Sequence, residues 1–585
     1  MFDVVYNSQD SEYKKPFGAV SLNTNINFKI KANASCDVKI IIKTLDGFEE
    51  YDLEYLEKDK DYYIYSIELD SSSYLGPFFY YFKFLKDGQT FYYTNNDELL
   101  GGVGKLCTEN PDLFYHGYVY DLKYDTPEWF KTGIIYHVFV DRFNNDDCSL
   151  ESVNKDLVEV YGGNLRGIIN KLDYLQDLGV SIVLLSPIFE SKSHHKYDVE
   201  DYKKIAEDYG DLDVFKELLC ELKKRDMHII LDGVFNHSGS NSKYFNKYGN
   251  YDSLGAYQSV DSKYYEWYRF NEFPDDYDCW QGIDTLPEFN QENQSFLDYF
   301  FKNEESVVNY WMNLGIDGWR LDAADLLSDK LLSIIFDVVK KNNPDTVIIG
   351  ELWNDATLFR HHSHGTINKF MCGNELESVI NYPLHGLILE YSKGSYTPQR
   401  FRQGFYSLME NYPKEYFYSL VNFLSTHDIE RLFYLLEGNF EYIKLAIVLS
   451  LTLPGVPLIY YGDEVGLDGG KDPDNRRPLP WRNINGKVYN HYKSLCIIRK
   501  NHDILKKGSI YFIENQDFLI YKRTFDGNRI YVIINNFKSK NFDVSRLSEK
   551  TIKFKDIETE DIYEYGDTIS IAEFDYKILL ELVVL

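Results

Sequence analysis

Short apolar segments alternate with amphipathic segments over residues 123–504, and this alternation constrains the fold more than any other feature of the chain. Strands and helices that alternate in this way predict an α/β fold, here a (β/α)8 TIM barrel. A long polar and aromatic loop, about residues 238–290, follows the third strand. The apolar segments expected to be strands are 133–140, 180–185, 228–235, 318–321, 347–350, 377–382, 419–424 and 456–460, and residues 295–314 are expected to form one helix.

The segments on either side of the barrel have the pattern of β structure. Residues 1–122 contain alternating and β-branched runs joined by Asp-Gly turns, such as Asp46-Gly47 and Asp87-Gly88. Residues 505–585 repeat the pattern, with a turn at Asp526-Gly527. We therefore expect an N-terminal β-sandwich domain, the catalytic barrel at 123–504, and a C-terminal β-sandwich domain.

The charge of the chain limits its partners. It has 62 Lys+Arg against 92 Asp+Glu, a formal net charge of −30, which disfavours binding to nucleic acid or to an anionic membrane.

No apolar run reaches the roughly 18 residues of a membrane span, and no targeting signal is visible, so a cytoplasmic protein is expected. The seven Cys are scattered without a CxxC pair, which predicts neither a disulfide framework nor a zinc knuckle.

Polar residues follow four of the expected strands. Asp322 follows the fourth strand, Glu351 the fifth, His427 and Asp428 the seventh, and the polar segment 232–237 ends the third. Because barrel enzymes carry their chemistry at the carboxyl ends of the strands, these side chains are expected to meet at one rim. Three carboxylates, those of Asp322, Glu351 and Asp428, would then lie near the centre.

The chemistry expected of these groups is acid–base and nucleophilic. Arg320 and Asp322 point to the same face of a strand, so the guanidinium should lower the pKa of Asp322 and keep it ionised as a nucleophile. Partial desolvation should raise the pKa of Glu351, as a general acid requires. Two such carboxyl groups about 5 Å apart suit retaining glycoside hydrolysis. The alternatives are purely structural roles: an ion pair for Arg320 and Asp322, a solvated Glu351, and a helix N-cap at His427-Asp428.

These segments together resemble the α-amylase family of glycoside hydrolases, in particular its neopullulanase, cyclomaltodextrinase and maltogenic-amylase branch. The similarity extends over nearly the whole chain. It implies that Asp322 is the nucleophile, Glu351 the acid/base and Asp428 the transition-state stabiliser. The motifs that carry it are Asp232 to His237, Gly318 to Asp322, Gly350 to Trp353, Phe423 to Asp428, and Leu286 to Asn290.

The resemblance also implies a sugar-binding set. In the family a Tyr after the second strand, here Tyr197, stacks on the sugar that is being cleaved. A segment similar to the branch's DPDCRR sequence supplies an Asp and an Arg to the same subsite. The implied substrate-binding residues are Tyr197, His237, Arg320, Trp353, His427, Asp472 and Arg476.

The chain departs from the branch at several positions. Asp322 is followed by Ala323-Ala324-Asp325-Leu326 where Val-Ala-Asn-Glu is usual, Glu288 stands where Lys is usual, and His137 where Gln is common. These differences leave the linkage preference and transglycosylation open.

A metal is a further expectation from the resemblance. Asn145, Asp147 and Gly162 match a Ca²⁺ loop of relatives, although Leu150 and Asn164 replace other ligands. No cofactor is otherwise required. The histidines at 361, 362 and 364 could instead serve a zinc-dependent hydrolase together with His237 and Asp232.

We therefore expect a retaining hydrolase that cleaves α-1,4 and, as an open alternative, α-1,6 glucosidic bonds in malto-oligosaccharides, cyclodextrins or pullulan. The alternatives are a pullulanase or oligo-1,6-glucosidase-like enzyme and, more remotely, a glucan-binding protein without catalysis. In the branch the N-terminal domain often completes the active site of a dimer, so a homodimer through residues 1–122 is expected.

Overall fold

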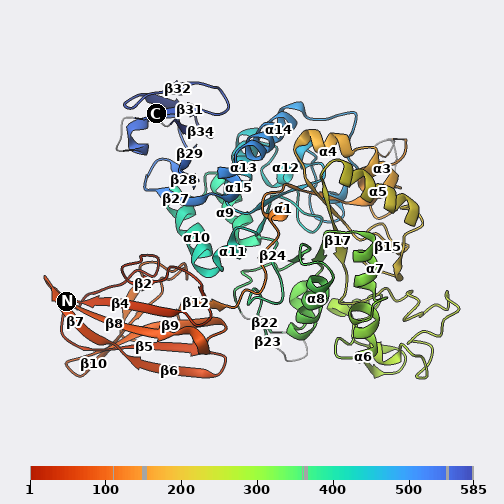
Figure 1. The fold of residues 1–585 in the computed structure, drawn as a ribbon, viewed down its shortest axis with the longest axis horizontal. Coiled ribbons are helices and arrows are strands. Elements are labelled where there is room, and N and C mark those ends of the chain that lie inside the picture. The colour runs from red at the N-terminus through yellow and green to blue at the C-terminus, as the bar shows by residue number, and fades with distance from the viewer. Residues whose placement is uncertain are drawn as a thin grey trace.

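The computed structural model describes residues 2–109, 111–147, 150, 155–358, 360–361, 367–548 and 552–582. Figure 1 shows the N-terminal strands in red, the helix-rich middle of the chain, and the C-terminal strands in blue. Among the described residues, no helix combines the length and the apolar character needed to cross a membrane.

Eight parallel strands form the centre of the molecule, and every strand expected in the middle of the chain is present. Their order is β24-β21-β20-β17-β14-β13-β26-β25, and a parallel bridge between Ile380 and Val421 joins the two ends of the sheet. The (β/α)8 barrel is therefore confirmed. The strands are β13 (Ile135–Val138), β14 (Ile182–Leu185), β17 (His228–Gly233), β20 (Gly318–Leu321), β21 (Val347–Gly350), β24 (Ser378–Val379), β25 (Val421–Phe423) and β26 (Val456–Tyr460).

Helices surround this barrel. They begin at capping side chains and bury their apolar faces. Asp211, Ser306, Ser328 and Thr397 each accept a backbone N–H at a helix start, an interaction worth about 1 kcal/mol per cap. The main helices are α3 (Leu165–Ile169), α4 (Leu172–Leu178), α5 (Leu212–Lys224), α7 (Val307–Leu314), α8 (Asp329–Asn342), α9 (Tyr382–Ser392), α10 (Pro398–Asn411), α11 (Lys414–Phe417), α13 (Phe440–Thr452), α14 (Gly486–Asn501) and α15 (Asp503–Lys507).

One expected helix is broken. The apolar spacing over 295–314 suggests a continuous helix, but α6 (Gln294–Leu297) and a π-helical turn (Asp298–Lys302) precede α7. The chain turns at Asn303, whose backbone is extended, and α7 restarts at its own cap, Ser306. A capping serine inside an apolar pattern therefore marked a new helix, which the periodicity alone did not reveal.

The loop after the third strand is ordered by aromatic packing. It contains β18 (Phe270–Glu272) and β19 (Asp276–Tyr277). Phe245 packs against Tyr268 and Tyr277 with ring centroids 4.8 and 4.7 Å apart. This insertion joins the rim of the barrel through a bridge between His237 and Glu288.

Two sheets pack face to face in the N-terminal region, with Phe28 and Tyr80 among the buried residues between them. The expected turns at Gly47 and Gly88 join β5 to β6 and β9 to β10, and both glycines have positive φ. The strands are β1 (Val4–Val5), β2 (Lys14–Lys15), β3 (Val20–Ser21), β4 (Asn25–Ala32), β5 (Asp37–Thr44), β6 (Gly47–Asp52), β7 (Glu54–Asp59), β8 (Tyr62–Asp70), β9 (Gly76–Lys86), β10 (Gln89–Thr94), β11 (Lys105–Cys107) and β12 (Tyr115–Tyr120).

A six-stranded and a two-stranded sheet form the C-terminal region, with Ile533 and Phe542 in their shared core. The strands are β27 (Ser509–Ile513), β28 (Leu519–Phe525), β29 (Asn528–Asn535), β30 (Lys540–Asp543), β31 (Lys553–Asp556), β32 (Ile562–Tyr563), β33 (Thr568–Ile571) and β34 (Asp575–Leu582). The β-sandwich regions on both sides of the barrel agree with the expected fold class, while the limits at residues 122 and 504 stay predictions.

Candidate active site

A cleft of about 700 Å³ lies at the carboxyl ends of the barrel strands. Nine of the ten residues predicted to act in catalysis or substrate binding line it, and the tenth, Arg320, lies buried beneath them. The nine are Tyr197, His237, Asp322, Glu351, Trp353, His427, Asp428, Asp472 and Arg476.

Arg320 joins three carboxylates at the base of this cleft. Its Nη1 lies 2.7 Å from Asp232 Oδ2 and 2.9 Å from Asp322 Oδ1, and its Nη2 lies 2.8 Å from Glu351 Oε2. Strand register explains the contacts, because Asp232 pairs directly with Arg320 across β17 and β20, and Glu351 follows β21 on the other side. Asp322 and Glu351 are therefore neighbours on one guanidinium.

Because several carboxylates share one guanidinium, the pKa values at the base of the cleft differ from those expected. Burial raises the pKa of Asp322 well above its ordinary value, and the nearby charges of Glu351, Asp232 and Asp428 raise it further, although Arg320 opposes the shift. Burial likewise raises the pKa of Asp232. The expected lowering of the Asp322 pKa is therefore wrong in this structure, because one cation is divided among several buried carboxylates. Such groups take up and release protons as a unit.

Glu351 is held by three donors. Its Oε2 accepts the backbone N–H of Ala323 at 2.9 Å in addition to the Arg320 ion pair, and its Oε1 accepts Nε1 of Trp353 at 3.1 Å. Ala323 has a φ of 41°, a strained conformation for a residue with a side chain, and this turns its N–H toward the carboxylate. The Trp353 ring is stacked on Tyr382 with centroids 4.7 Å apart. Trp353 therefore contacts the carboxyl group itself, a role that the sequence did not suggest.

Four of the other predicted residues form a second network that reaches Asp232 through Tyr197. The Tyr197 hydroxyl donates to Asp232 Oδ2 at 2.8 Å and lies 2.6 Å from Nε2 of His427, whose ring it stacks against. His427 Nε2 is 3.3 Å from Asp428 Oδ2. Arg476 Nη2 lies 3.7 Å from Asp428 Oδ1. These polar edges face the cleft and suit the hydroxyl groups of a sugar.

The protonation of this network follows from burial. Burial lowers the pKa of His427 well below its ordinary value, so its imidazole is neutral. Burial also raises the pKa of Asp428 to about 7, against the pull of Arg320 and Arg476. The alternative of a helix N-cap at 427–428 is wrong, because the following helix, α12 (Leu432–Leu435), has Arg431 at its N-cap position.

The tip of the insertion forms one wall of the cleft, which the sequence indicated only in general terms. Trp280, Gln281, Ile283 and Leu286 line the cleft, and the Trp280 ring lies 5.5 Å from that of His237. The concentration of all the tryptophans in the middle of the chain was the signal. Their positions could not be assigned because they depend on how the insertion folds back over the rim.

The described residues of the predicted Ca²⁺ loop include two positions that differ from the ligands of relatives. Asn164 Oδ1 accepts the N–H of Gly167 at the start of α3, and Leu150 is fully buried and supplies no side-chain oxygen. The N–H of Gly162 donates to Asp141 Oδ1 at 2.9 Å. Both positions, 150 and 164, matter because Ca²⁺ prefers six to eight oxygen ligands. Ca²⁺ at Asn145, Asp147 and Gly162 stays a prediction.

The zinc alternative is not supported by the described residues, which contain no cluster of three His, Cys, Asp or Glu side chains suited to a metal ion. The histidines at 362 and 364 lie outside the described part of the chain.

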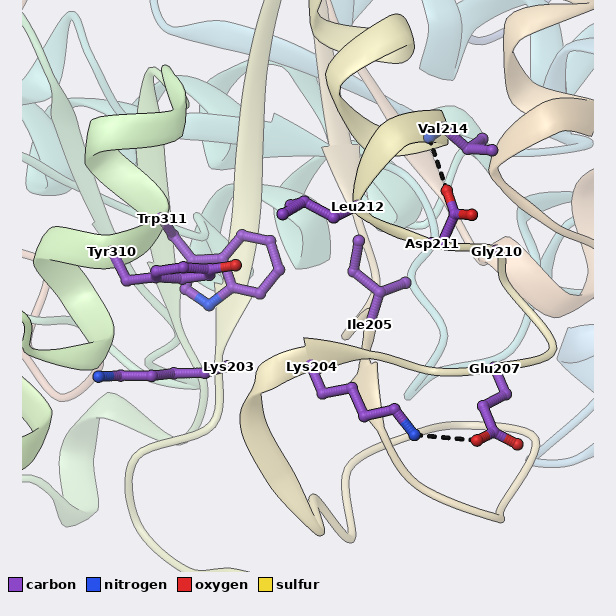
Figure 2. A pocket seen from close by; sticks show the side chains of 10 residues that line it. All are labelled: Lys203, Lys204, Ile205, Glu207, Gly210, Asp211, Leu212, Val214, Tyr310 and Trp311. Atoms are coloured by element: carbon purple, nitrogen blue, oxygen red, sulfur yellow. Dashed lines mark hydrogen bonds and ion pairs between the residues drawn. The ribbon is translucent and has the colours of Figure 1, made fainter.

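A second hollow of about 530 Å³ lies elsewhere on the barrel, among β16 (Asp201–Ile205), α5 and α7. Figure 2 shows Tyr310 and Trp311 on one side of it and the paired side chains of Lys204 and Glu207 on another. It contains none of the predicted site residues.

A closed parallel barrel with carboxylates at its strand ends is an arrangement that a glycoside hydrolase can use. The comparisons with known proteins agree with this class. Residues 137–486 match the model of the alpha amylase catalytic domain. The chain belongs to the alpha-amylase family.

Several relatives carry this similarity. Amylopullulanase from Thermoanaerobacterium thermosulfurigenes is 31% identical over 654 residues, which cover 95% of this chain and 34% of that protein. Neopullulanase 2 from Thermoactinomyces vulgaris is 33% identical over 452 residues, which cover 72% of this chain and 73% of that protein. The structure of a cyclomaltodextrinase is similar with a TM-score of 0.72, 25% identity and 99% coverage of both chains. The chain spans only 34% to 50% of the length of three amylopullulanases that it matches.

Proposed function

We propose that this protein hydrolyses α-glucans with retention of the anomeric configuration. The observation that carries the proposal is the pairing of Asp322 and Glu351 on one guanidinium at the base of a cleft. Retaining glycosidases need a nucleophilic carboxylate and an acid/base carboxyl at close range on the two sides of the scissile bond. The family membership supports the same assignment.

The proposed reaction has two steps. A carboxylate oxygen of Asp322 attacks the anomeric carbon while Glu351 gives its proton to the leaving glycosidic oxygen, so that a glycosyl ester forms and the C–O bond breaks. Glu351 then takes a proton from water, whose oxygen attacks the same carbon and releases Asp322. The carboxylates of the cleft exchange protons as a coupled group, and the proposed reaction requires that the transferred proton leaves from Glu351. Asp428 and the neutral His427 would bind the hydroxyl groups of the reacting sugar.

The substrates that we propose are malto-oligosaccharides, cyclodextrins and pullulan, with α-1,4 bonds cleaved and α-1,6 bonds as the alternative. The relatives named neopullulanase, cyclomaltodextrinase and amylopullulanase support this range. The test is separate incubation with β-cyclodextrin, pullulan, starch, maltotriose and isomaltose. We expect maltose or panose as products and cyclodextrin cleaved faster than starch. Cleavage of isomaltose and pullulan α-1,6 bonds alone would favour the pullulanase or oligo-1,6-glucosidase alternative.

A glucan-binding protein without catalysis is less well supported, because all three acidic residues face the cleft. A homodimer through the N-terminal sheets is part of the proposal and is checked by light scattering of the chain with and without residues 1–122. A cytoplasmic location stays a prediction from the sequence.

A further inference from the structure

The segment that follows β21 is fixed by a side chain of the N-terminal sheets. His116, on β12, has Nδ1 3.0 Å from Asn411 Oδ1 and Nε2 3.2 Å from the carbonyl oxygen of Thr357. The Asn411 amide donates to Asp355 Oδ2 at 2.8 Å. Both oxygens are acceptors, and burial lowers the pKa of His116, so the neutral imidazole has one N–H to donate. We place it on Nε2, where it donates to Thr357 and holds the segment 353–358, while the ring lies beside the end of α10. In Figure 1, β12 lies at the side of the N-terminal sheets that faces the barrel.

The centre of this segment is buried, and hydrogen bonds hold its turn. Asp355 Oδ1 accepts both the N–H of Thr357 at 2.9 Å and its hydroxyl at 2.6 Å, and the N–H of Ala356 donates to the Tyr412 hydroxyl at 2.9 Å. Thr357 and Ala356 are almost completely buried. A buried carbonyl that loses its partner destabilises the conformation that buries it. Removal of the His116 ring would therefore loosen the turn.

The turn also carries Trp353, which reaches the acid/base. Trp353 Nε1 donates to Glu351 Oε1 at 3.1 Å, and its ring is stacked on Tyr382. We infer that His116 is a positioning residue for Glu351, acting through the 353–358 turn and Trp353. The inference rests on the proposed function, in which Glu351 is the acid/base. It gives the N-terminal sheets a role in the active site of their own chain, apart from any role in a dimer.

The test compares two substrates that differ in their need for an acid. Maltotriose has a poor leaving group that must be protonated, whereas 4-nitrophenyl α-maltoside releases a stabilised anion that needs little help. For His116→Leu we expect kcat/KM on maltotriose to fall about ten-fold and kcat/KM on the nitrophenyl substrate less than about two-fold, because kcat/KM reports the first step and not the hydrolysis of the glycosyl ester that both substrates share. A merely structural role would lower activity on both substrates alike.

Tyr120→Phe is the matched control. Tyr120 lies on the same strand, and its hydroxyl donates to Glu415 Oε2 of α11 at 2.9 Å, so its loss weakens a contact between the N-terminal sheets and the barrel without touching the turn. We expect this variant to match the wild type on both substrates. Trp353→Phe keeps an aromatic ring at this position and removes the N–H donor. It should show the same substrate-dependent loss as His116→Leu, and the double variant should lose no more than either single variant.

Equal losses on the two substrates, no loss, or losses that multiply in the double variant would overturn the inference. If the leucine variant does not fold, His116→Asn takes its place, because its amide can reach Asn411 but not Thr357, and the same pattern is expected. A wild type without activity on either substrate would instead count against the proposed function.

Discussion

Replacement of Glu351 by glutamine removes one ionisable proton from the cleft with almost no change in volume. The glutamate accepts three donors on two oxygens: Arg320 and the Ala323 N–H on Oε2, and the Trp353 indole on Oε1. A glutamine has one acceptor oxygen, which should stay with the two donors. Its amide N–H2 then faces the Trp353 N–H, and the indole must shift. Because 47% of Trp353 is exposed, this shift should cost only about 1 kcal/mol.

The loss of catalysis should be much larger than this structural cost. General acid catalysis contributes roughly 10² to 10⁴ in rate, or about 3 to 5 kcal/mol of transition-state stabilisation. We therefore expect Glu351→Gln to lower kcat on maltotriose by about 10³, while the dissociation constant for maltotriose, measured by calorimetry, stays within about three-fold.

A matched variant separates this effect from a general one. Glu217→Gln changes an exposed glutamate on α5 that pairs with Arg166, and it should leave kcat unchanged. Azide added to Glu351→Gln with 4-nitrophenyl α-maltoside should restore turnover and give an α-glycosyl azide, because azide needs no base. Wild-type activity in Glu351→Gln would refute the assignment of the acid/base.

Three further perturbations test other parts of the account. Arg320→Lys replaces a planar donor shared by three buried carboxylates with a point charge, so kcat should fall at least about 100-fold and the free energy of unfolding in urea by about 2–4 kcal/mol. Glu464 is fully buried, and burial raises its pKa to about 7. The folded state thus keeps a proton that the unfolded chain releases near pH 4, so this contribution to stability is complete at low pH and is lost as pH rises through 7. Glu464→Gln should therefore gain about 3 kcal/mol relative to the wild type between pH 4 and 8, measured by urea unfolding. EDTA should leave both kcat and the melting temperature unchanged, because Leu150 and Asn164 replace two ligands of the Ca²⁺ loop.

Each of these has a contrary outcome. Arg320→Lys with normal kcat would show that the shared guanidinium is dispensable. A difference between Glu464→Gln and the wild type that does not vary with pH would place the titration elsewhere. A melting temperature that falls in EDTA and recovers with Ca²⁺ would establish the ion in spite of the two replaced ligands.

The barrel and the location of its cleft could be predicted because short segments of the sequence indicate both. An apolar run that ends in Glu351 or Asp322 marks a strand end, and parallel strands bring their ends to one rim. The side-chain contacts that hold the catalytic carboxylates could not be predicted in the same way. That Asp232 shares Arg320 depends on register between β17 and β20, and that Trp353 bonds Glu351 depends on the turn that follows.

The same distinction explains the errors. The expected pKa of Asp322 considered only the arginine two residues away, whereas burial and three other carboxylates determine the direction. The helix expected over 295–314 was broken by a serine cap that the apolar spacing conceals. Interactions across strands decided the first case, which a single segment does not contain, whereas the second was decided by a local cap that hydrophobic periodicity does not detect.

The configuration of the first product tests the central claim most directly. Proton NMR of β-cyclodextrin or maltotriose digests, recorded before mutarotation, should show the α-anomer of the newly formed reducing end, as attack by Asp322 followed by water requires. Release of the β-anomer would mean that water attacks the sugar directly, and the pairing of Asp322 with Glu351 would then need a different explanation.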